Sequence, residues 1–387
     1  MKILQIAPPW LNVPPVGYGG TEAVISNLTE GLINEGHTVT LFATGKSKTK
    51  GTLKYFYKTS LRDQNIDWSY ALPALLHYTE AFNVARNDGY DMIHTHMSCS
   101  SDVMTMEMIA KCNTPSIMTI HGYFPFDLVS NTDKYFLDLY GHKIAAVNIS
   151  HAMVDSCPKE FYQAGIVHNG VDTNSYSHNL SQNNDYFTWV GKITKNKGLY
   201  EAILATKKAN EKLIFAGFIE PTAIENTQYF NEKIKPLIDN NQIQYLGPAD
   251  FKLKNELMKN AKGFLNPIQW KEPFGMVMAE SLACGTPVIS YANGAAIEII
   301  QDGKNGFLIP ESIDSMVNRM KRINEIDRSV CRKIAVEKFS IEAMVRDYSK
   351  IYKKVIDLNL KFKNPIKKSE KIFKIFKPKN IKFENEL

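Results

Sequence analysis

Two glutamates between Asn266 and Tyr291 are the side chains of this chain best placed to do chemistry. Glu272 precedes a proline, a position that favours extended backbone over helix. Glu280 lies inside a short helix, predicted from about Gly275 to Cys284. Burying its carboxylate among apolar side chains costs free energy unless the oxygens find hydrogen-bond partners. A sugar diol is one partner that could engage both oxygens.

Both ends of this predicted helix carry signals. Pro273 suits a first turn, where its missing N–H costs nothing, and Gly285 suits the position after the last turn. At the start, the backbone amides of Phe274, Gly275 and Met276 are expected to lack partners within the helix. Such amides can donate to the oxygens of an anionic or polar ligand.

The two glutamates belong to a longer pattern, E-P-F-G-x-x-x-x-E-x-x-A-x-G-x-P-V-I. An amphipathic helix with one exposed glutamate is the plain alternative. The whole pattern resembles the donor-site motif of retaining glycosyltransferases of the GT-B fold, family 4 in particular. The resemblance implies that Glu280 holds the ribose hydroxyls of a nucleotide sugar. It also implies that Glu272 and the amides of Phe274, Gly275 and Met276 hold sugar hydroxyls.

The N-terminus reads as strand, glycine turn, helix and strand, which is the opening of a doubly wound sheet. The strands are predicted over residues 2–6 and 37–42, with Thr21 as the helix cap. The turn is not G-x-G-x-x-G, so a dinucleotide site is disfavoured. Gly19 and Gly20 would instead let the backbone approach a phosphate, or simply form a tight turn. This opening also resembles that of family 4 enzymes.

Histidines follow two of the predicted strands. His94 and His96 share one face of a strand, with Cys99 nearby, but no further ligand at a recognisable spacing supports a metal site. We therefore expect these two to be polar lining near a strand end. His121 follows a strand over residues 116–120, where ligands bind in open α/β sheets. A lone histidine there would more often be structural, but the resemblance implies contact with the sugar or its phosphate.

Lysines follow the strand predicted over residues 186–190 and precede a helix. Helix amides and ammonium groups together could bind a diphosphate, whereas a solvated surface is the plain alternative. The stretch resembles the family motif V-G-R-x-x-x-x-K-G. Lys197 matches it, and Lys192 replaces the usual arginine, which keeps the charge but loses the two-pronged fork.

The resemblance implies transfer of a hexose-type sugar, with retention, from a nucleotide diphosphate sugar to a glycan or lipid-linked glycan. Such a role belongs to polysaccharide or glycolipid biosynthesis. The predicted catalytic residues are His121, Glu272, Lys192 and Lys197. The chain has no Asp-x-Asp pair, so we expect a metal-independent reaction with no cofactor besides the donor.

Three rival functions remain open from the sequence. A phosphorylase of the same fold would use the same pocket with free phosphate. An epimerase would need acidic catalytic residues that have no counterpart here. A non-catalytic nucleotide-sugar-binding subunit would keep Lys197 and Glu280 but lose His121 and the paired Gly19 and Gly20, which are intact.

The length of 387 residues suggests two domains. The fold class predicted is α/β, with two Rossmann-like domains facing across a cleft and a C-terminal helix crossing back to the first. We expect an acceptor-side domain over residues 1–170, a nucleotide-sugar donor domain over 171–345, a crossover helix over 346–360 and a basic tail over 361–387.

Composition limits the classes of protein that fit. The hydrophobic fraction of 44% is that of a globular protein, and no apolar run is long enough for a signal peptide or a membrane span. Five cysteines without CxxC spacing fit a reducing compartment, so we expect a cytoplasmic protein. The formal net charge of +6 comes from the tail alone, which excludes a nucleic-acid-binding surface spread over the fold.

The tail over residues 361–387 interleaves lysines with Ile and Phe. Such a segment suits the anionic inner face of a membrane, where each lysine contributes about 1 kcal/mol. A solvated tail or a segment that docks on a protein is the alternative. Peripheral contact with a membrane would fit a lipid-linked acceptor.

Overall fold

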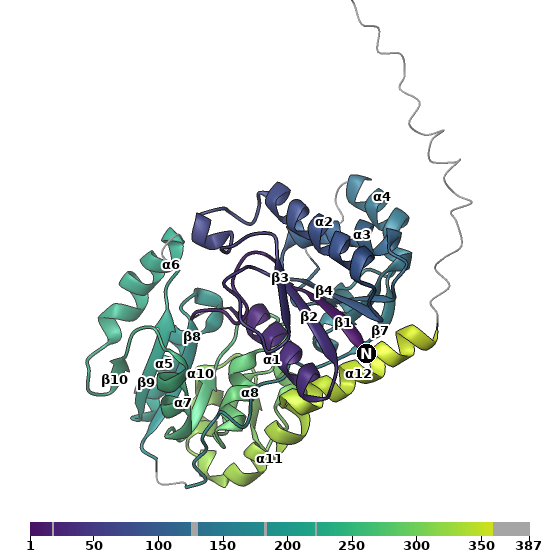
Figure 1. The fold of residues 1–387 in the computed structure, drawn as a ribbon. Coiled ribbons are helices and arrows are strands. Elements are labelled where there is room, and N and C mark those ends of the chain that lie inside the picture. The colour runs from purple at the N-terminus through teal and green to yellow at the C-terminus, as the bar shows by residue number, and fades with distance from the viewer. Residues whose placement is uncertain (18, 125–130, 182–183, 221–222, 359–387) are drawn as a thin grey trace, which may run out of the picture.

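The computed structural model describes residues 1–387 apart from 18, 125–130, 182–183, 221–222 and 359–387. Two parallel sheets organise these residues (Figure 1). The first has the order β3-β2-β1-β4-β5-β6-β7. Its strands are β1 (Lys2–Ile6), β2 (Thr38–Ala43), β3 (Thr52–Tyr55), β4 (Met92–Met97), β5 (Ser116–Ile120), β6 (Ala145–Asn148) and β7 (Tyr162–Ile166).

The second sheet has the order β10-β9-β8-β11-β12-β13 and is also parallel. Its strands are β8 (Tyr186–Lys192), β9 (Lys212–Phe218), β10 (Ile243–Tyr245), β11 (Gly263–Asn266), β12 (Val288–Tyr291) and β13 (Gly306–Ile309). In both sheets the order reverses around the first strand of the half, β1 or β8, as in a doubly wound fold. The predicted α/β class is confirmed.

Helices alternate with the strands along the chain. They are α1 (Gly20–Asn34), α2 (Ala71–Asp88), α3 (Thr105–Lys111), α4 (Asn131–Tyr140), α5 (Leu199–Ala209), α6 (Ile224–Tyr229), α7 (Phe251–Lys259), α8 (Met276–Ala283), α9 (Ala296–Ile299), α10 (Ile313–Met320), α11 (Arg328–Phe339) and α12 (Ile341–Asp357). Within the described residues, no helix combines the length and the apolar character needed to cross a bilayer.

Helix α1 begins two residues earlier than expected. Gly19 is its N-cap, so the prediction that Thr21 caps the helix is wrong. Thr21 lies inside the first turn, because the backbone already turns helical at Gly20. The helix is held by its apolar face, on which Val24 and Leu28 are buried. Packing of that face, rather than a side-chain cap, therefore holds this helix.

Helix α8 matches its predicted bounds to within a residue. Gly275 precedes it with φ of +85°, and Gly285 follows it with φ of +75°. Both are left-handed conformations that glycine adopts without steric cost. Between them the chain buries Ala279 and Leu282, which seat the helix against the second sheet. The local signals thus place Glu280 inside the helix, as predicted.

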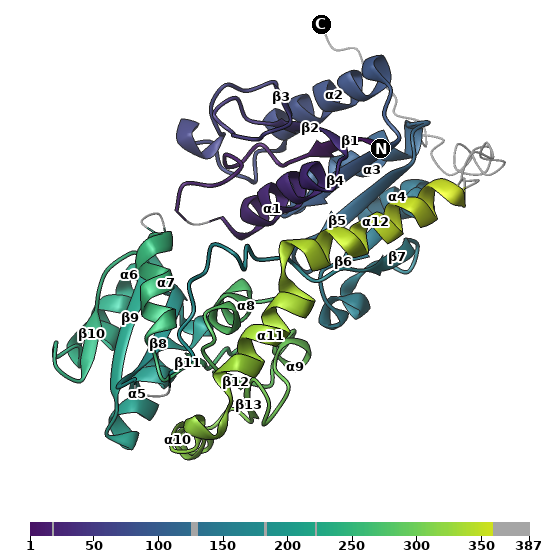
Figure 2. The same cartoon turned by 60° about the horizontal axis from the view of Figure 1, so that its bottom comes forward.

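The last helix returns to the first half of the molecule. It begins at Ser340, whose hydroxyl accepts from the amide of Ala343, and then packs on α1 and beside β5 and β7 (Figure 2). Close approach requires Gly31 of α1, because a Cβ there would lie 2.5 Å from Ile341 and 2.6 Å from Val345. The predicted crossover helix is therefore present. The domain limits at 170 and 345 stay predictions, and the basic tail lies outside the described residues.

Candidate active site

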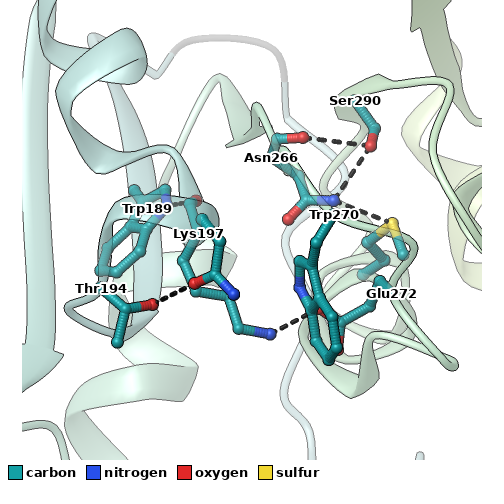
Figure 3. Close-up of polar contacts among 9 residues, drawn as sticks. Trp189, Thr194, Lys197, Asn266, Trp270, Glu272 and Ser290 are labelled. Carbon is teal, nitrogen blue, oxygen red and sulfur yellow. Dashed lines mark hydrogen bonds and ion pairs between the residues drawn. The ribbon is translucent and has the colours of Figure 1, made fainter. Parts of the chain in front are cut away.

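Lys197 and Glu272, predicted independently, form a direct ion pair. The ammonium of Lys197 donates to Oε2 of Glu272 over 2.5 Å (Figure 3). The indole N–H of Trp270 donates to the same oxygen over 2.8 Å, and its ring centre lies 5.1 Å from the Lys197 ammonium. Lys197 ends the 3-10 turn Lys195–Lys197 after β8, whereas Trp270 and Glu272 lie between β11 and α8. Sequence reasoning missed Trp270, which carries no motif signal.

The backbone of Glu272 is held by the loop after β12. The amide of Ala295 donates to the Glu272 carbonyl over 2.9 Å. Gly294, with φ of +55°, packs so closely that a Cβ would lie 2.3 Å from the Glu272 nitrogen. A side chain at Gly294 would therefore displace the carboxylate that meets Lys197.

Three backbone amides beside Glu272 remain available as donors. Among the described residues, no hydrogen bond uses the N–H of Phe274, Gly275 or Met276. Phe274 itself is buried, which anchors the segment, while Gly275 provides the sharp entry into α8. The arrangement matches the predicted set of donors at a helix start.

Lys192 does not join the Lys197 pair. Its ammonium lies 3.5 Å from Oε2 of Glu220, and the guanidinium of Arg62 donates to Oε1 of the same carboxylate over 3.0 Å. Arg62 comes from the first half of the chain, on the turn Arg62–Gln64. Lys192 is the last residue of β8, and Glu220 follows the adjacent strand β9. An arginine fork thus lies near the lysine that replaces the family arginine. No sequence signal pointed to Arg62 or Glu220.

Glu280 is 7% exposed, and only one of its two carboxylate oxygens has a hydrogen-bond partner among the described residues. Lys254 of α7 donates to Oε1 over 2.5 Å, whereas Oε2 is buried without a hydrogen-bond partner among the described residues. Burial and the charge of Glu280 raise the pKa of the neighbouring Tyr176 phenol. A carboxylate with one paired and one unpaired oxygen can accept from a ligand hydroxyl without losing its charge partner. Lys254 was missed by sequence reasoning.

His121 is a neutral imidazole. Burial lowers its pKa to about 3, and its Nε2 lies 2.9 Å from Nδ1 of His96. His94 and His96 are fully buried and hydrogen-bonded inside the sheet, so the expectation of a polar lining is wrong for both. Within the part of the chain that the structure describes, no group of three or more His, Cys, Asp or Glu could hold a metal ion.

Tyr123 links the His121 segment to the Glu272 segment. Its ring centre lies 6.4 Å from that of Trp270, in edge-to-face contact. Its hydroxyl is buried without a partner among the described residues, and burial and the charge of Glu272 raise its pKa. The contact brings the segment after β5 against the loop between β11 and α8. A tyrosine two residues beyond His121 gave no signal in the sequence.

The paired glycines serve different purposes. A Cβ on Gly19 would lie 2.6 Å from Pro15 and 3.1 Å from Glu22, so Gly19 is required by the packing of its own loop. Gly20 is exposed, and a Cβ there would meet nothing within 4 Å. The space beside Gly20 is therefore open, whereas that beside Gly19 is filled. Glu22, in the first turn of α1, has its pKa raised to about 7 by burial.

Two family models match consecutive parts of the chain. The model "Glycosyltransferase Family 4" matches residues 18–175, and "Glycosyl transferases group 1" matches residues 171–337. Together they contain both halves of the site, from the glycines of α1 to the loop that holds Glu272.

Named relatives are similar over most of their length. An uncharacterised glycosyltransferase of Methanocaldococcus jannaschii is 23% identical, over 92% of this chain and 99% of its own. The N-acetyl-alpha-D-glucosaminyl L-malate synthase of Bacillus anthracis is 21% identical, over 87% of this chain and 94% of its own.

Solved structures share the fold. Sucrose-phosphate synthase from Thermosynechococcus elongatus superposes with a TM-score of 0.72 at 18% identity, over 92% of this chain and 99% of its own. Anabaena HepE, solved with UDP and glucose, superposes with a TM-score of 0.69 at 17% identity, over 92% of this chain and all of its own. The chain is therefore an enzyme of the GT-B fold and belongs to glycosyltransferase family 4.

Proposed function

We propose that this glycosyltransferase moves a hexose-type sugar, with retention, from a nucleotide diphosphate sugar to a glycan or lipid-linked glycan. The observation that carries the proposal is the Lys197–Glu272 pair beside the three unpaired amides that begin α8. In this arrangement the ammonium of Lys197 would bind the diphosphate, and Glu272 and the amides would bind the sugar hydroxyls. HepE, solved with UDP and glucose, supports a donor of this kind.

The nucleoside end of the donor fits Glu280. Its unpaired Oε2 can accept from a ribose hydroxyl, while Oε1 stays paired with the Lys254 ammonium. The apolar environment of α8 makes that hydrogen bond stronger than it would be in water. Glu280 is therefore assigned to binding rather than to chemistry.

Positive charge at the leaving group drives the reaction we propose. As the bond between the sugar and the diphosphate breaks, negative charge grows on the phosphate oxygens. Lys197 and Lys192 stabilise that charge more in the transition state than in the ground state. The acceptor hydroxyl attacks from the face that the diphosphate leaves, and the diphosphate takes up its proton, so that retention needs no protein nucleophile. Glu272, already engaged by Lys197 and Trp270, orients the sugar and the lysine.

The first half of the chain supplies the opposite wall. His121 meets the sugar as a neutral group, since burial keeps its pKa far below neutrality. The contact between Tyr123 and Trp270 keeps the His121 segment beside Glu272. Because the lysines and amides can neutralise the charge of the diphosphate, we propose a reaction that needs no metal ion. We also propose that the enzyme is cytoplasmic.

A screen of nucleotide sugars tests this proposal. The purified protein should slowly hydrolyse one donor of the panel, and NMR should detect the released sugar first in the anomeric form of the donor. Activity should survive EDTA. An inverted product, or loss of activity in EDTA with rescue by a divalent ion, would overturn the mechanism. Release of sugar phosphate from a glycan with free phosphate would instead make it a phosphorylase, and binding without turnover a non-catalytic subunit.

A further inference from the structure

A chain of side-chain hydrogen bonds connects the crossover helix to His121. Its members lie on five elements of the chain: β1, β4, β5, the segment after β5, and α12. Every member except His121 is at most 1% exposed. The contacts are Tyr348 hydroxyl to Thr119 Oγ1 (2.8 Å), Thr119 Oγ1 to His94 Nε2 (2.7 Å), His94 Nδ1 to Tyr352 hydroxyl (2.7 Å), Tyr352 hydroxyl to Gln5 Nε2 (3.1 Å), Gln5 Oε1 to His96 Nε2 (2.8 Å) and His96 Nδ1 to His121 Nε2 (2.9 Å).

The Gln5 amide, which lies between Tyr352 and His96 in this series of hydrogen bonds, assigns the protons. An amide oxygen only accepts, so Nε2 of His96 must carry the hydrogen that meets Gln5 Oε1. His96 is neutral, because burial holds its pKa well below the usual value. Its Nδ1 is then a lone pair, and His121 must donate to it from Nε2. His121 is neutral as well, which leaves its Nδ1 unprotonated.

The Gln5 amide lies with its NH₂ toward the Tyr352 hydroxyl and its oxygen toward His96. The amide NH₂ donates to the Tyr352 oxygen, and the Tyr352 hydrogen is then directed to Nδ1 of His94. His94 in turn donates from Nε2 to Thr119. Turning the amide over would require every proton from His121 to Thr119 to change place. The whole chain therefore acts as one unit with a single polarity.

We infer that Gln5 and Tyr352 are positioning residues that hold His121 as the Nε2–H tautomer. With Nε2 engaged by His96, Nδ1 is the ring nitrogen left for a ligand, and it can only accept. An acceptor suits a sugar hydroxyl and repels a phosphate oxygen, so His121 recognises the sugar and not the diphosphate. The identity of that ligand rests on the proposed function, whereas the tautomer does not.

The crossover helix offers a matched pair of variants. Tyr352→Phe removes the hydroxyl that orients Gln5. Tyr348→Phe removes an equally buried hydroxyl from the same helix, one turn away, but leaves the contacts of Gln5 with Tyr352 and His96 in place. Both should lose similar stability in urea unfolding, so any difference at His121 reports on the polarity of the chain.

Long-range ¹H–¹⁵N NMR of the full chain labelled at histidine reads the tautomer directly, with His121→Gln to assign the signal. The wild type and Tyr348→Phe should show His121 as Nε2–H. Tyr352→Phe should show a mixture, with kcat lowered by about tenfold, the value of one hydrogen bond, and unchanged affinity for nucleoside diphosphates.

Two outcomes would overturn the inference: an Nδ1–H tautomer in the wild type, or the same His121 tautomer in both variants. The expected tautomers together with no sugar transfer would leave it standing while removing the proposed function. Sugar transfer with an Nδ1–H tautomer would do the reverse. The two ideas therefore fail separately.

Discussion

At the scale of single residues, the site consists of carboxylates that each hold a lysine. Glu272 pairs with Lys197, Glu280 with Lys254, and Glu220 lies between Lys192 and Arg62. Since all three carboxylates are more than four-fifths buried, their charges require such partners. The ion pairs orient the lysines before a ligand arrives, which lowers the cost of ordering them on binding.

Replacing Lys197 should slow chemistry more than binding. Lys197→Ala removes the charge beside the breaking bond, and we expect turnover to fall on the order of 100-fold. Affinity for a nucleoside monophosphate, measured by calorimetry, should change little. Lys195→Ala is the control, since Lys195 lies exposed on the same turn. An equal loss of affinity for monophosphate and diphosphate would place Lys197 elsewhere on the ligand.

Neutralising Glu280 should weaken nucleotide binding. Glu280→Gln accepts less strongly from ribose hydroxyls and leaves the Lys254 ammonium without its charge partner. The expected loss is about 1–3 kcal/mol of binding free energy, which calorimetry with nucleoside diphosphates can measure. Glu256→Gln is the control. It removes the same kind of charge from an exposed glutamate of α7 that pairs with Lys259. Unchanged affinity in Glu280→Gln would refute the ribose assignment.

The buried histidines predict how stability depends on pH. Unfolded His121 takes up a proton as the pH falls below about 6.5, whereas in the folded protein its pKa is about 3. The unfolded state therefore binds more protons between these values, and stability falls as the pH falls through this window. In urea unfolding from pH 7 to pH 5, His121→Asn should show a shallower loss than the wild type. An unchanged slope would mean that folding does not lower the pKa of His121.

At the scale of elements, short turns that contain glycine position the residues of the candidate site. Gly275 begins α8, and Gly294 buttresses Glu272 from the loop after β12. Neither position contributes a side chain to the ligand. The backbone conformations of Gly275 and Gly294 decide where Glu272 and the amides at the start of α8 lie. These two glycines therefore position the site without contacting a ligand.

A substitution at Gly294 should separate strain from function. Gly294→Ala forces a Cβ onto the backbone of Glu272 at a φ of +55°, so it should abolish most transfer activity and cost about 1–3 kcal/mol of stability. Gly303→Ala is matched in backbone, with φ of +74°, but its Cβ would meet nothing within 4 Å. It should lose stability and keep activity. Equal activity in the two variants would show that the loop does not position Glu272.

At the scale of the whole molecule, the two halves are tied at several points. Glu298 accepts from the amides of His151 and Ala152 and from the His168 ring, and Arg62 reaches Glu220. The crossover helix adds an apolar contact with α1. These contacts hold the two halves of the chain against each other.

The tail is predicted to anchor the whole enzyme. The full chain should sediment with anionic vesicles at low salt and be released at high salt, because surface charge is screened. Removing residues 361–387 should abolish sedimentation and leave donor hydrolysis unchanged. A variant with the tail's Ile and Phe replaced by Ser, its lysines kept, separates charge from apolar insertion. Equal binding by the truncated protein would exclude the tail as the anchor.

The sequence by itself determined the parts of this protein that depend on local chemistry. The bounds of α8 follow from Gly275, Pro287 and the apolar residues between them, whose conformational limits act over a few bonds. The strands predicted over residues 2–6, 37–42, 116–120 and 186–190 follow from short apolar runs bounded by turns, and the donor motif from its residue order, whereas β3 and β7 were not predicted. Lys197 and Glu272 could be named before either was located.

Only the tertiary structure decided which distant groups meet. Lys254 beside Glu280, Tyr123 against Trp270, and the chain from Tyr352 to His121 join segments far apart in sequence. No local pattern encodes such pairs, because each partner is chosen by the way sheets and helices pack. Burial then sets the protonation. It lowers the pKa of both His94 and His96, and each is hydrogen-bonded, His94 to the last helix and His96 to Gln5 and His121.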